Sequence, residues 1–289
     1  MSVYRRQKRR RRAVGRIILW IIVLICALTA VSNILIRRED IEIESAKLPA
    51  QFDGFRIAEL SDVHAAEFFN SDNAYLVSAV EDTDPDLIVI TGDLIDEKKD
   101  YYEECAAVKG LISGIIDIAP VMYVTGNHEW SVPEMFDFLD MLTDMGVRVL
   151  RNEYVTMSAG GESIVIAGID DPCGYADRKT PAQLMEEIRQ NEGQDVYTVL
   201  LAHRNDMLSE AKELGFDLVL CGHAHGGLIR LPWTDGLVGP SREWFPKYTS
   251  GLYTDGDTAM IVSRGIGNHT GIPRFLSFPH IPVAVLKAQ

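Results

Sequence analysis

Residues 221–227 read Cys-Gly-His-Ala-His-Gly-Gly and place His223 and His225 two positions apart. They follow the apolar run 216–220, which predicts a buried strand. The flanking glycines allow the backbone to turn tightly and to approach a small ligand. Imidazoles presented in this way are typical of metal ligands. Alone, the pattern favours an ordinary pair of surface-loop histidines, so a metal site requires further ligands at other strand ends.

Four other apolar runs, at residues 56–60, 87–91, 121–125 and 197–202, are followed by polar side chains of this kind. The side chains that follow them are those of Asp62, His64, Asp93, Asn127, His128 and His203. Because open α/β sheets bind ligands at the carboxyl ends of their strands, we expect these groups to gather at one edge. Carboxylates mixed with imidazoles suit Mn²⁺, Fe²⁺/Fe³⁺ or Zn²⁺ better than Ca²⁺ or Mg²⁺. The pattern therefore favours a metal site over simple strand-end capping.

The N-terminal segment differs sharply in charge from the rest of the chain. Residues 1–38 hold ten of the 28 Lys and Arg residues and no acid, so the remainder has 18 basic against 42 acidic residues, a net charge of -24. A domain this acidic is a poor candidate for nucleic-acid binding, which depends on a basic surface. We therefore expect no nucleic acid among its partners.

Residues 17–36 form an uncharged run of 20 residues after the basic segment 1–16. That length spans a hydrocarbon core of roughly 30 Å. Positive charge on the N-terminal side predicts a single-pass protein with a cytoplasmic basic head and its remaining domain on the outer face of the cell membrane. A cleavable signal peptide and a twin-arginine export signal are the competing interpretations, and a retained signal-anchor is preferred. Residues 37–47 are expected to be a charged linker, in which Ile41 to Glu44 alternate as a half-exposed strand would.

From residue 48 to residue 289, strands alternate with helical stretches, which predicts one layered α/β domain. The expected helices cover residues 72–82, 101–113, 133–144, 181–190 and 206–213. Further strands are expected at 147–150, 164–167, 228–231, 260–264 and 283–286. Two sheets packed face to face, with helices outside, accommodate both halves of this pattern.

The motifs Asp62-x-His64, Gly92-Asp93, Gly126-Asn-His-Glu129, His203 and Gly222-His-x-His225 resemble the calcineurin-like metallophosphoesterase superfamily. The resemblance covers the chain from residue 48 onward, and the N-terminal anchor is similar to the YkuE/YaeI-like, membrane-associated branch. It implies a four-layer α/β/β/α sandwich. It also implies that Asp62, His64 and His225 hold one metal ion and that Asn127, His203 and His223 hold a second. Asp93 would bridge the two ions, and His128 would act beside the leaving group.

The implied activity is that of a binuclear metal-dependent phosphohydrolase, with two divalent ions (Mn, Fe or Zn) whose shared hydroxide attacks phosphorus in line. A phosphodiesterase or pyrophosphatase activity is the preferred interpretation. The alternatives are a phosphomonoesterase or protein phosphatase, and a metal-binding scaffold without turnover. The membrane anchor favours a lipid- or envelope-linked phosphoester as substrate.

Several other polar residues have roles that the sequence leaves open. Asp96 is expected to cap a turn or support a ligand, and Arg204 to contact phosphate or pair with a carboxylate. Asp170 and Asp171 are explained by a turn, and His280 by a structural role. Three residues of a glycine-rich loop are candidates for the cleft wall: Asn268, His269 and Arg274. The aromatic residues of the loop 232–253 are expected to cap the site, to bind an apolar group of the substrate, to touch the bilayer or to form a small core of their own.

Overall fold

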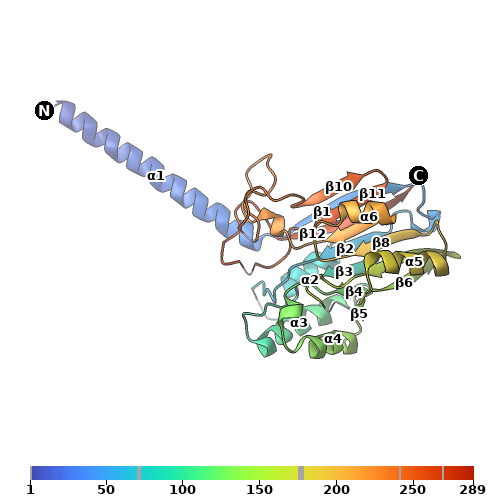
Figure 1. Cartoon of the computed structure of the whole chain (residues 1–289). Helices are drawn as coiled ribbons and strands as arrows, with labels where there is room; N and C mark the ends of the chain where they lie inside the picture. Colours follow the sequence, from blue (N-terminus) through green and yellow to red (C-terminus); the bar gives the residue numbers. More distant parts are fainter. Residues whose placement is uncertain (1, 70–72, 175–178, 241, 269) are drawn as a thin grey trace.

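The computed structural model describes residues 2–69, 73–174, 179–240, 242–268 and 270–289. Within these residues, the strands form two six-stranded sheets (Figure 1). The first sheet has, in order, β1 (Arg37–Ser45), β12 (His280–Ala288), β2 (Arg56–Leu60), β3 (Leu87–Thr91), β4 (Val121–Val124) and β5 (Arg148–Val149). The second has β10 (Gly251–Asp255), β11 (Thr258–Val262), β9 (Leu218–Cys221), β8 (Tyr197–Leu201), β7 (Glu162–Gly168) and β6 (Glu153–Ala159).

The centre of each sheet is parallel. Strands β2 to β5 run in one direction in the first sheet, and β7, β8, β9 and β11 do so in the second. Such strands are buried on both faces, which explains why their sequences read as continuous apolar runs. The antiparallel pairings are β12 with β2, β6 with β7 and β10 with β11.

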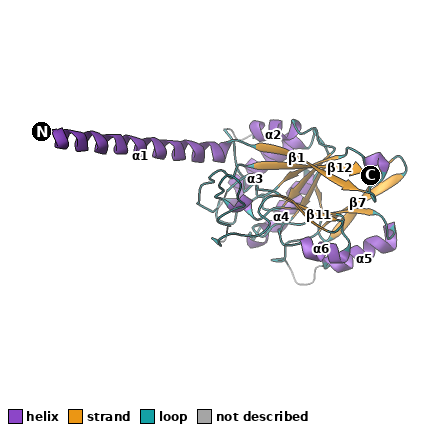
Figure 2. Cartoon of the chain, turned by 90° about the horizontal axis from the view of Figure 1, so that it is seen from above, coloured by secondary structure: helices purple, strands orange, loops and turns teal. Residues whose placement is uncertain are grey.

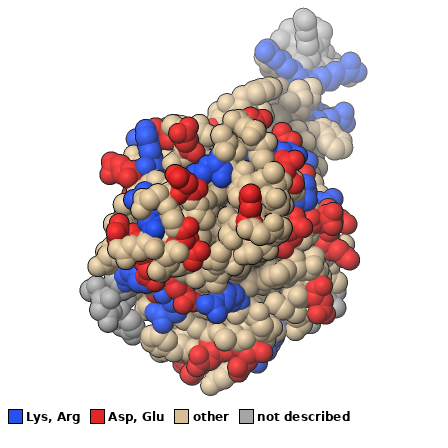
Figure 3. Space-filling view, turned by 90° about the vertical axis from the view of Figure 1, so that its right-hand side faces the viewer, with Lys and Arg blue, Asp and Glu red and all other residues tan. Residues whose placement is uncertain are grey.

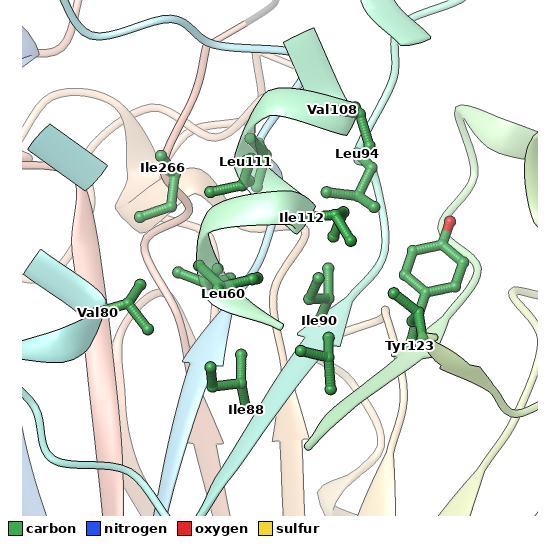
Figure 4. Packing of buried hydrophobic residues seen from close by; sticks show 14 of the residues in the cluster. Leu60, Val80, Ile88, Ile90, Leu94, Val108, Leu111, Ile112, Tyr123 and Ile266 are labelled. Carbon is green, nitrogen blue, oxygen red and sulfur yellow. The ribbon is translucent and has the colours of Figure 1, made fainter. Parts of the chain in front are cut away.

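Helices cover the outer face of each sheet, so the expected four-layer sandwich is confirmed. The helices on the first sheet are α2 (Ala74–Glu81), α3 (Tyr101–Ile115) and α4 (Met135–Asp144), and those on the second are α5 (Pro181–Glu192) and α6 (Leu208–Leu214). Figure 4 shows Leu111 and Ile112 of α3 above Ile90 of β3. The alternate residues of the same strands, such as Val89, face the second sheet and form the core between the two sheets.

Helix α1 (Ser2–Ile34) projects from the domain as a single helix (Figures 1 and 2). Its segment Gln7–Ile34 is long and apolar enough to cross a membrane, because it contains an 18-residue window with a mean hydropathy of 2.6 and few side chains buried against the protein. Only Leu35 and Ile36 separate α1 from β1.

The expected linker at residues 37–47 is not a linker. Residues Arg37–Ser45 form β1, which pairs in parallel with β12 from Arg37↔His280 to Ser45↔Ala288. Ile41 and Ile43 are buried between the sheets while the acids between them face solvent, as the alternating pattern predicted for an edge strand. The folded domain therefore begins at residue 37, directly after the helix.

The expected strand at residues 228–231 is also wrong. This segment makes only isolated bridges, from Leu228 and Ile229 to Val238 and from Ile229 to Phe275. Leu228 has φ 35°, which breaks an extended conformation. Two strands were not predicted, β6 and β10, because their half-exposed residues lack an apolar run. On the face turned away from α1, acidic and basic side chains of the described residues are interspersed (Figure 3).

Candidate metal centre

The loops after β2, β3 and β9 hold five of the seven expected ligands in left-handed backbone conformations. The φ values are 49° for Asp62, 50° for His64, 54° for Asp93, 64° for His223 and 48° for His225. Asp, Asn and His accept this region more readily than branched residues, although it still disfavours any side chain. Backbone strain of this kind concentrates at functional sites. A Cβ at Gly222 would collide with Ser61 and Asp62, so the two loops meet only because glycine stands there.

The first ligand group consists of Asp62, His64 and His225, which are fully buried and whose donor atoms lie within 4.8 Å of one another. His225 Nε2 lies 3.4 Å from His64 Nε2 and 3.4 Å from Asp62 Oδ1. Asp62 Oδ2 accepts hydrogen bonds from Ser61 Oγ at 2.7 Å and from the His223 N–H at 3.0 Å. Its second oxygen, Oδ1, is buried without a hydrogen bond among the described residues. That oxygen and the two imidazoles therefore point at a common position.

The second group converges on His203. Its Nδ1–H donates to the carbonyl oxygen of Thr91 at 2.8 Å, which leaves Nε2 to face the site. Nε2 lies 3.1 Å from each of Asp93 Oδ2, Asn127 Oδ1 and His223 Nδ1. Burial would lower the pKa of His203, but the Asp93 carboxylate outweighs it and raises the pKa to about 10. Burial, with the charges of His203 and Arg204, lowers the pKa of His223 to about 3.

These donor sets fit two divalent cations. Three electron-pair donors surround His203 Nε2, whereas a single proton can satisfy only one of those contacts. A cation accommodates all of them at once, and imidazole with carboxylate oxygen suits Mn, Fe or Zn. Asp93 belongs both to the group of His203 and His223 and to the group of His64 and His128. It is thus the one of the seven expected ligands placed between the two groups.

His128 lies beside the two groups and not within either coordination set. Its ring packs edge-on against His64, with centroids 4.8 Å apart, and its Nε2 lies 3.8 Å from Asp93 Oδ2. On the opposite side, Nδ1 contacts the Glu97 carboxylate closely and lies 3.7 Å from Asp96 Oδ1. Glu97 was not singled out from the sequence, where it reads as one charge in an exposed loop. Asp96 caps its own turn by accepting from the Lys98 N–H at 3.0 Å.

Glu129 ties the loops after β3 and β4 together. Its fully buried carboxylate accepts hydrogen bonds from the N–H groups of Asp93 at 3.0 Å, Leu94 at 2.6 Å and Gly126 at 2.7 Å. Burial, with the neighbouring Asp93 charge, raises the pKa of Glu129 to about 7. The sequence placed Glu129 in the motif but gave no sign of this role, because its partners are backbone groups of another strand end.

Arg204 pairs with a carboxylate, which is one of the two roles expected for it. Its Nε donates to Asp171 Oδ2 at 2.6 Å, and its Nη1 lies 2.8 Å from His223 Nε2. Burial raises the pKa of Asp171, but the hydrogen bond from Arg204 outweighs it and leaves that pKa lowered. Asp170 accepts from Thr125 Oγ1 at 2.9 Å and joins the loop after β7 to the loop after β4, so neither aspartate is explained by a turn alone.

Arg274 is fully buried behind His225. Its guanidinium donates to the carbonyl oxygens of Gly267 at 2.6 Å and His225 at 3.3 Å. Asn268 is bound to its own loop through Ile272, and His269 lies outside the described residues. His280 is buried in β12 and contacts Glu39 Oε2 at 3.1 Å, a structural position.

The aromatic loop divides into two parts. The rings of Tyr248 and Tyr253 pack together with centroids 5.0 Å apart, against the outer core of the second sheet. Trp233, Trp244 and Phe245 are instead exposed to solvent. The loop thus combines a small core with an exposed apolar tip.

Comparisons with known proteins agree with this geometry. Residues 55–227 match the family model described as calcineurin-like phosphoesterase. The chain is 34% identical over 251 residues to the uncharacterized metallophosphoesterase YkuE of Bacillus subtilis, covering 85% of this chain and 84% of that protein. It is 30% identical to a Danio rerio transmembrane protein with metallophosphoesterase domain, covering 86% of this chain and 56% of that protein. It is 26% identical to the phosphodiesterase YaeI of Escherichia coli, covering 75% and 77% of the two chains. With the motifs, the four layers and the paired ligand groups in place, the chain belongs to the family of calcineurin-like phosphoesterases.

Proposed function

We propose that this protein is a membrane-anchored, two-metal phosphohydrolase that prefers phosphodiesters or pyrophosphates to phosphomonoesters. The observation that carries the proposal is the position of Asp93, whose carboxylate lies within reach of His203 and His223 of the second group and also of His64 of the first group. Asp62, His64 and His225 would hold one ion, and Asn127, His203 and His223 the other. When bound, two such ions lower the pKa of an attacking water and neutralise charge on the phosphoryl oxygens.

The residues of the chain would orient the reaction. His128 is the candidate proton donor to the leaving oxygen, because its Nε2 faces Asp93 while its Nδ1 is held by Glu97. That contact also keeps the ring edge-on to His64. Glu129 fixes the loop that carries Asp93, so the bridging carboxylate does not have to be ordered when substrate arrives.

A preference for diesters is supported by the guanidinium groups that contact the metal-binding histidines. Arg204 is neutralised by Asp171, and Arg274 is buried against backbone carbonyls behind His225. A phosphomonoester carries one more negative charge than a diester and would gain more from a guanidinium free to face it. The similarity to a protein named phosphodiesterase points the same way.

The proposal of a membrane anchor is supported by α1, whose apolar side chains are mostly exposed. One relative is named a transmembrane protein with metallophosphoesterase domain. The basic residues precede the apolar segment, so the N-terminus would remain in the cytoplasm and the catalytic domain would face outward.

The test is hydrolysis of bis-p-nitrophenyl phosphate and p-nitrophenyl phosphate by the full chain in detergent, stripped of metal and then reconstituted with Mn²⁺, Zn²⁺ or Fe²⁺. We expect metal-dependent turnover that is greater on the diester and is lost in Asp93→Asn. Asp195→Asn, at an exposed turn before β8, is the matched control and should retain full activity.

Turnover of the monoester alone would replace the proposal with a phosphomonoesterase or protein phosphatase. Stoichiometric metal binding without turnover of either compound would favour a scaffold.

A further inference from the structure

The strand order places the metal centre on the side of the domain from which α1 leaves. β1 starts at Arg37, directly after α1, and runs parallel to β12 from the register pair Arg37↔His280. β2 runs antiparallel to β12, with Ala58 opposite Val283 and Arg56 opposite Val285, so β2 ends near the start of β1. β3 and β4 are parallel to β2. The edge that carries Asp62 and Asp93 is therefore the edge next to the end of α1.

The end of α1 is fixed to this edge by side chains. Asn33 Nδ2 donates to the carbonyl oxygen of Arg274 at 2.9 Å, and Asn33 Oδ1 accepts from the Arg274 N–H at 3.1 Å. Ser32 Oγ accepts from the Leu276 N–H at 2.9 Å. The Arg274 side chain in turn contacts the carbonyl oxygen of His225. The helix is thus attached to a segment that touches a metal-binding histidine.

A cavity of about 390 Å³ lies between α1 and the loops of the metal centre. Its apolar wall consists of Ile34, Ala66, Phe68, Phe69 and Ile266. Its volume falls in the range of sites for small ligands. The remaining wall includes Gly267, whose N–H donates to the carbonyl oxygen of Asp62 at 2.8 Å. The cavity therefore extends from α1 to a residue that is hydrogen-bonded to the backbone of Asp62, one of the expected metal ligands.

Exposed apolar side chains surround the same end of the domain. Phe69, at the cavity, is 77% exposed, and Trp233, Trp244 and Phe245 are at least 72% exposed. The segment that leads into the loop of the latter three is joined to Phe275, whose N–H donates to the carbonyl oxygen of Leu228 at 2.9 Å and whose carbonyl oxygen accepts from the Arg230 N–H at 2.9 Å. In Figure 1, the orange-to-red loops after β9 and β11 lie beside the C-terminal end of α1. Aromatic residues at the base of a membrane helix are typical of the lipid headgroup region.

Resting on the proposed function, we infer that the substrate is a phosphodiester of a membrane lipid, entering sideways from the leaflet next to the domain. Its apolar chain would occupy the cavity between α1 and Phe68, and its phosphate would lie at the metal centre. Water adds to phosphorus, the bond from phosphorus to the leaving oxygen breaks, and the leaving oxygen takes up the proton. The chain-bearing phosphate and the free alcohol are the products.

The test uses two diesters with the same leaving group, methyl p-nitrophenyl phosphate and hexadecyl p-nitrophenyl phosphate, with the full chain in phosphatidylcholine nanodiscs. Hydrolysis gives p-nitrophenol and the methyl or hexadecyl phosphate. Each buried methylene contributes roughly a factor of four to binding, so wild type should favour the hexadecyl diester in kcat/KM by more than about tenfold. Equal kcat/KM for the two diesters would overturn the inference.

Variants separate cavity binding from simple partitioning of the long chain into the bilayer. Ile34→Trp fills the cavity from the helix side, and Phe69→Asp places a charge at its rim. Each should lower kcat/KM on the hexadecyl diester at least about tenfold relative to wild type, with the methyl diester changed by less than about twofold. The matched controls are Ile21→Trp, exposed in the middle of α1, and Tyr102→Asp, exposed on α3, and both should behave as wild type.

The partitioning of the hexadecyl diester into the bilayer is the same for every variant. Equal losses of kcat/KM in the cavity variants and in the controls would therefore also overturn the inference. If the methyl diester is hydrolysed without any chain preference, only the lipid substrate is refuted. If neither diester is hydrolysed, the proposed phosphodiesterase function fails with it.

Discussion

Asn33 and Arg274 are 241 residues apart in sequence and joined through both backbone groups of Arg274. Helix α1 is therefore bound to the segment behind His225 and not only linked to it through the chain. Asn33→Ala removes both bonds, each contributing about 1 kcal/mol. We expect the Arg274 amide to exchange with solvent deuterium about five to ten times faster, measured by mass spectrometry on the full chain in detergent. Asn191→Ala, which removes an exposed bond to Tyr154, should leave that exchange unchanged.

The two ligand groups predict separable metal sites. His64→Ala removes a ligand from the first group and His203→Ala from the second, so each variant should retain about one Mn²⁺ per chain where wild type retains two. The count is made by elemental analysis after gel filtration. His280→Gln, which changes a buried histidine away from the site, should still hold two. Loss of both ions on removal of His64 would show one shared site in place of two.

Glu129→Gln should lower both the stability of the fold and the affinity of the centre for metal. A glutamine offers one acceptor oxygen where the carboxylate offers two, and its amide group would face N–H donors. Buried donors left without a partner destabilise by about 1–3 kcal/mol each. We expect a fall in Tm of about 5–10 °C together with weaker Mn²⁺ binding. Glu134→Gln, at an exposed position before α4, is the control, and an equal effect there would contradict the assigned role.

His128→Asn tests proton donation to the leaving group. A p-nitrophenol oxygen leaves readily without a proton, whereas an alkoxide does not, so the loss of kcat should depend on the leaving group. For a dialkyl phosphate the fall should approach about 10²- to 10⁴-fold, and for bis-p-nitrophenyl phosphate it should be clearly smaller. Glu97→Gln should reproduce the same ordering with smaller losses, since Glu97 only holds the ring. Equal losses on both substrates would assign His128 to binding.

His280 predicts a pH dependence of stability away from the metal centre. Burial, opposed by the contact with Glu39, lowers the pKa of His280 from 6.5 to about 4. Between pH 6.5 and pH 4 the unfolded chain binds a proton that the folded chain does not, so stability falls as pH falls, by about 1.4 kcal/mol per unit. His280→Gln removes this contribution, and its unfolding free energy should decline less steeply across that window. Parallel curves for the two proteins would show that His280 is not buried neutral.

The clustering of the expected ligands could be predicted because the sequence carries its signal locally. Each predicted ligand follows an apolar strand within a few residues, and the parallel pairing of β2, β3 and β4 brings the strand ends together. The expected helix positions match the observed ones for the same reason. The helix expected at residues 181–190, for example, is observed as Pro181–Glu192. There the apolar spacing is reinforced by a capping box of Thr180 and Gln183.

What could not be predicted depends on contacts between distant segments. β1 has a sequence as charged as a linker, and the alternation of residues 41–44 predicted only its middle; the strand covers Arg37–Ser45 because β12 lies beside it. The hydrogen bonds of Glu129 and Asn33 go to backbone groups that any sequence provides, so no residue pattern signals them. The role of Glu97 is not signalled by a residue pattern either, because its partner His128 follows a different strand.

The expected metal ligands are divided between the two sheets. Loops of the first sheet supply Asp62, His64, Asp93 and Asn127, and loops of the second supply His203, His223 and His225. Neither sheet holds a complete set, so an ion bound by both would hold together two layers that otherwise meet through apolar contacts. Because a ligand that binds only the folded state stabilises it in proportion to the logarithm of its concentration, the supply of metal would govern how firmly the sandwich stays closed, as well as whether it can act.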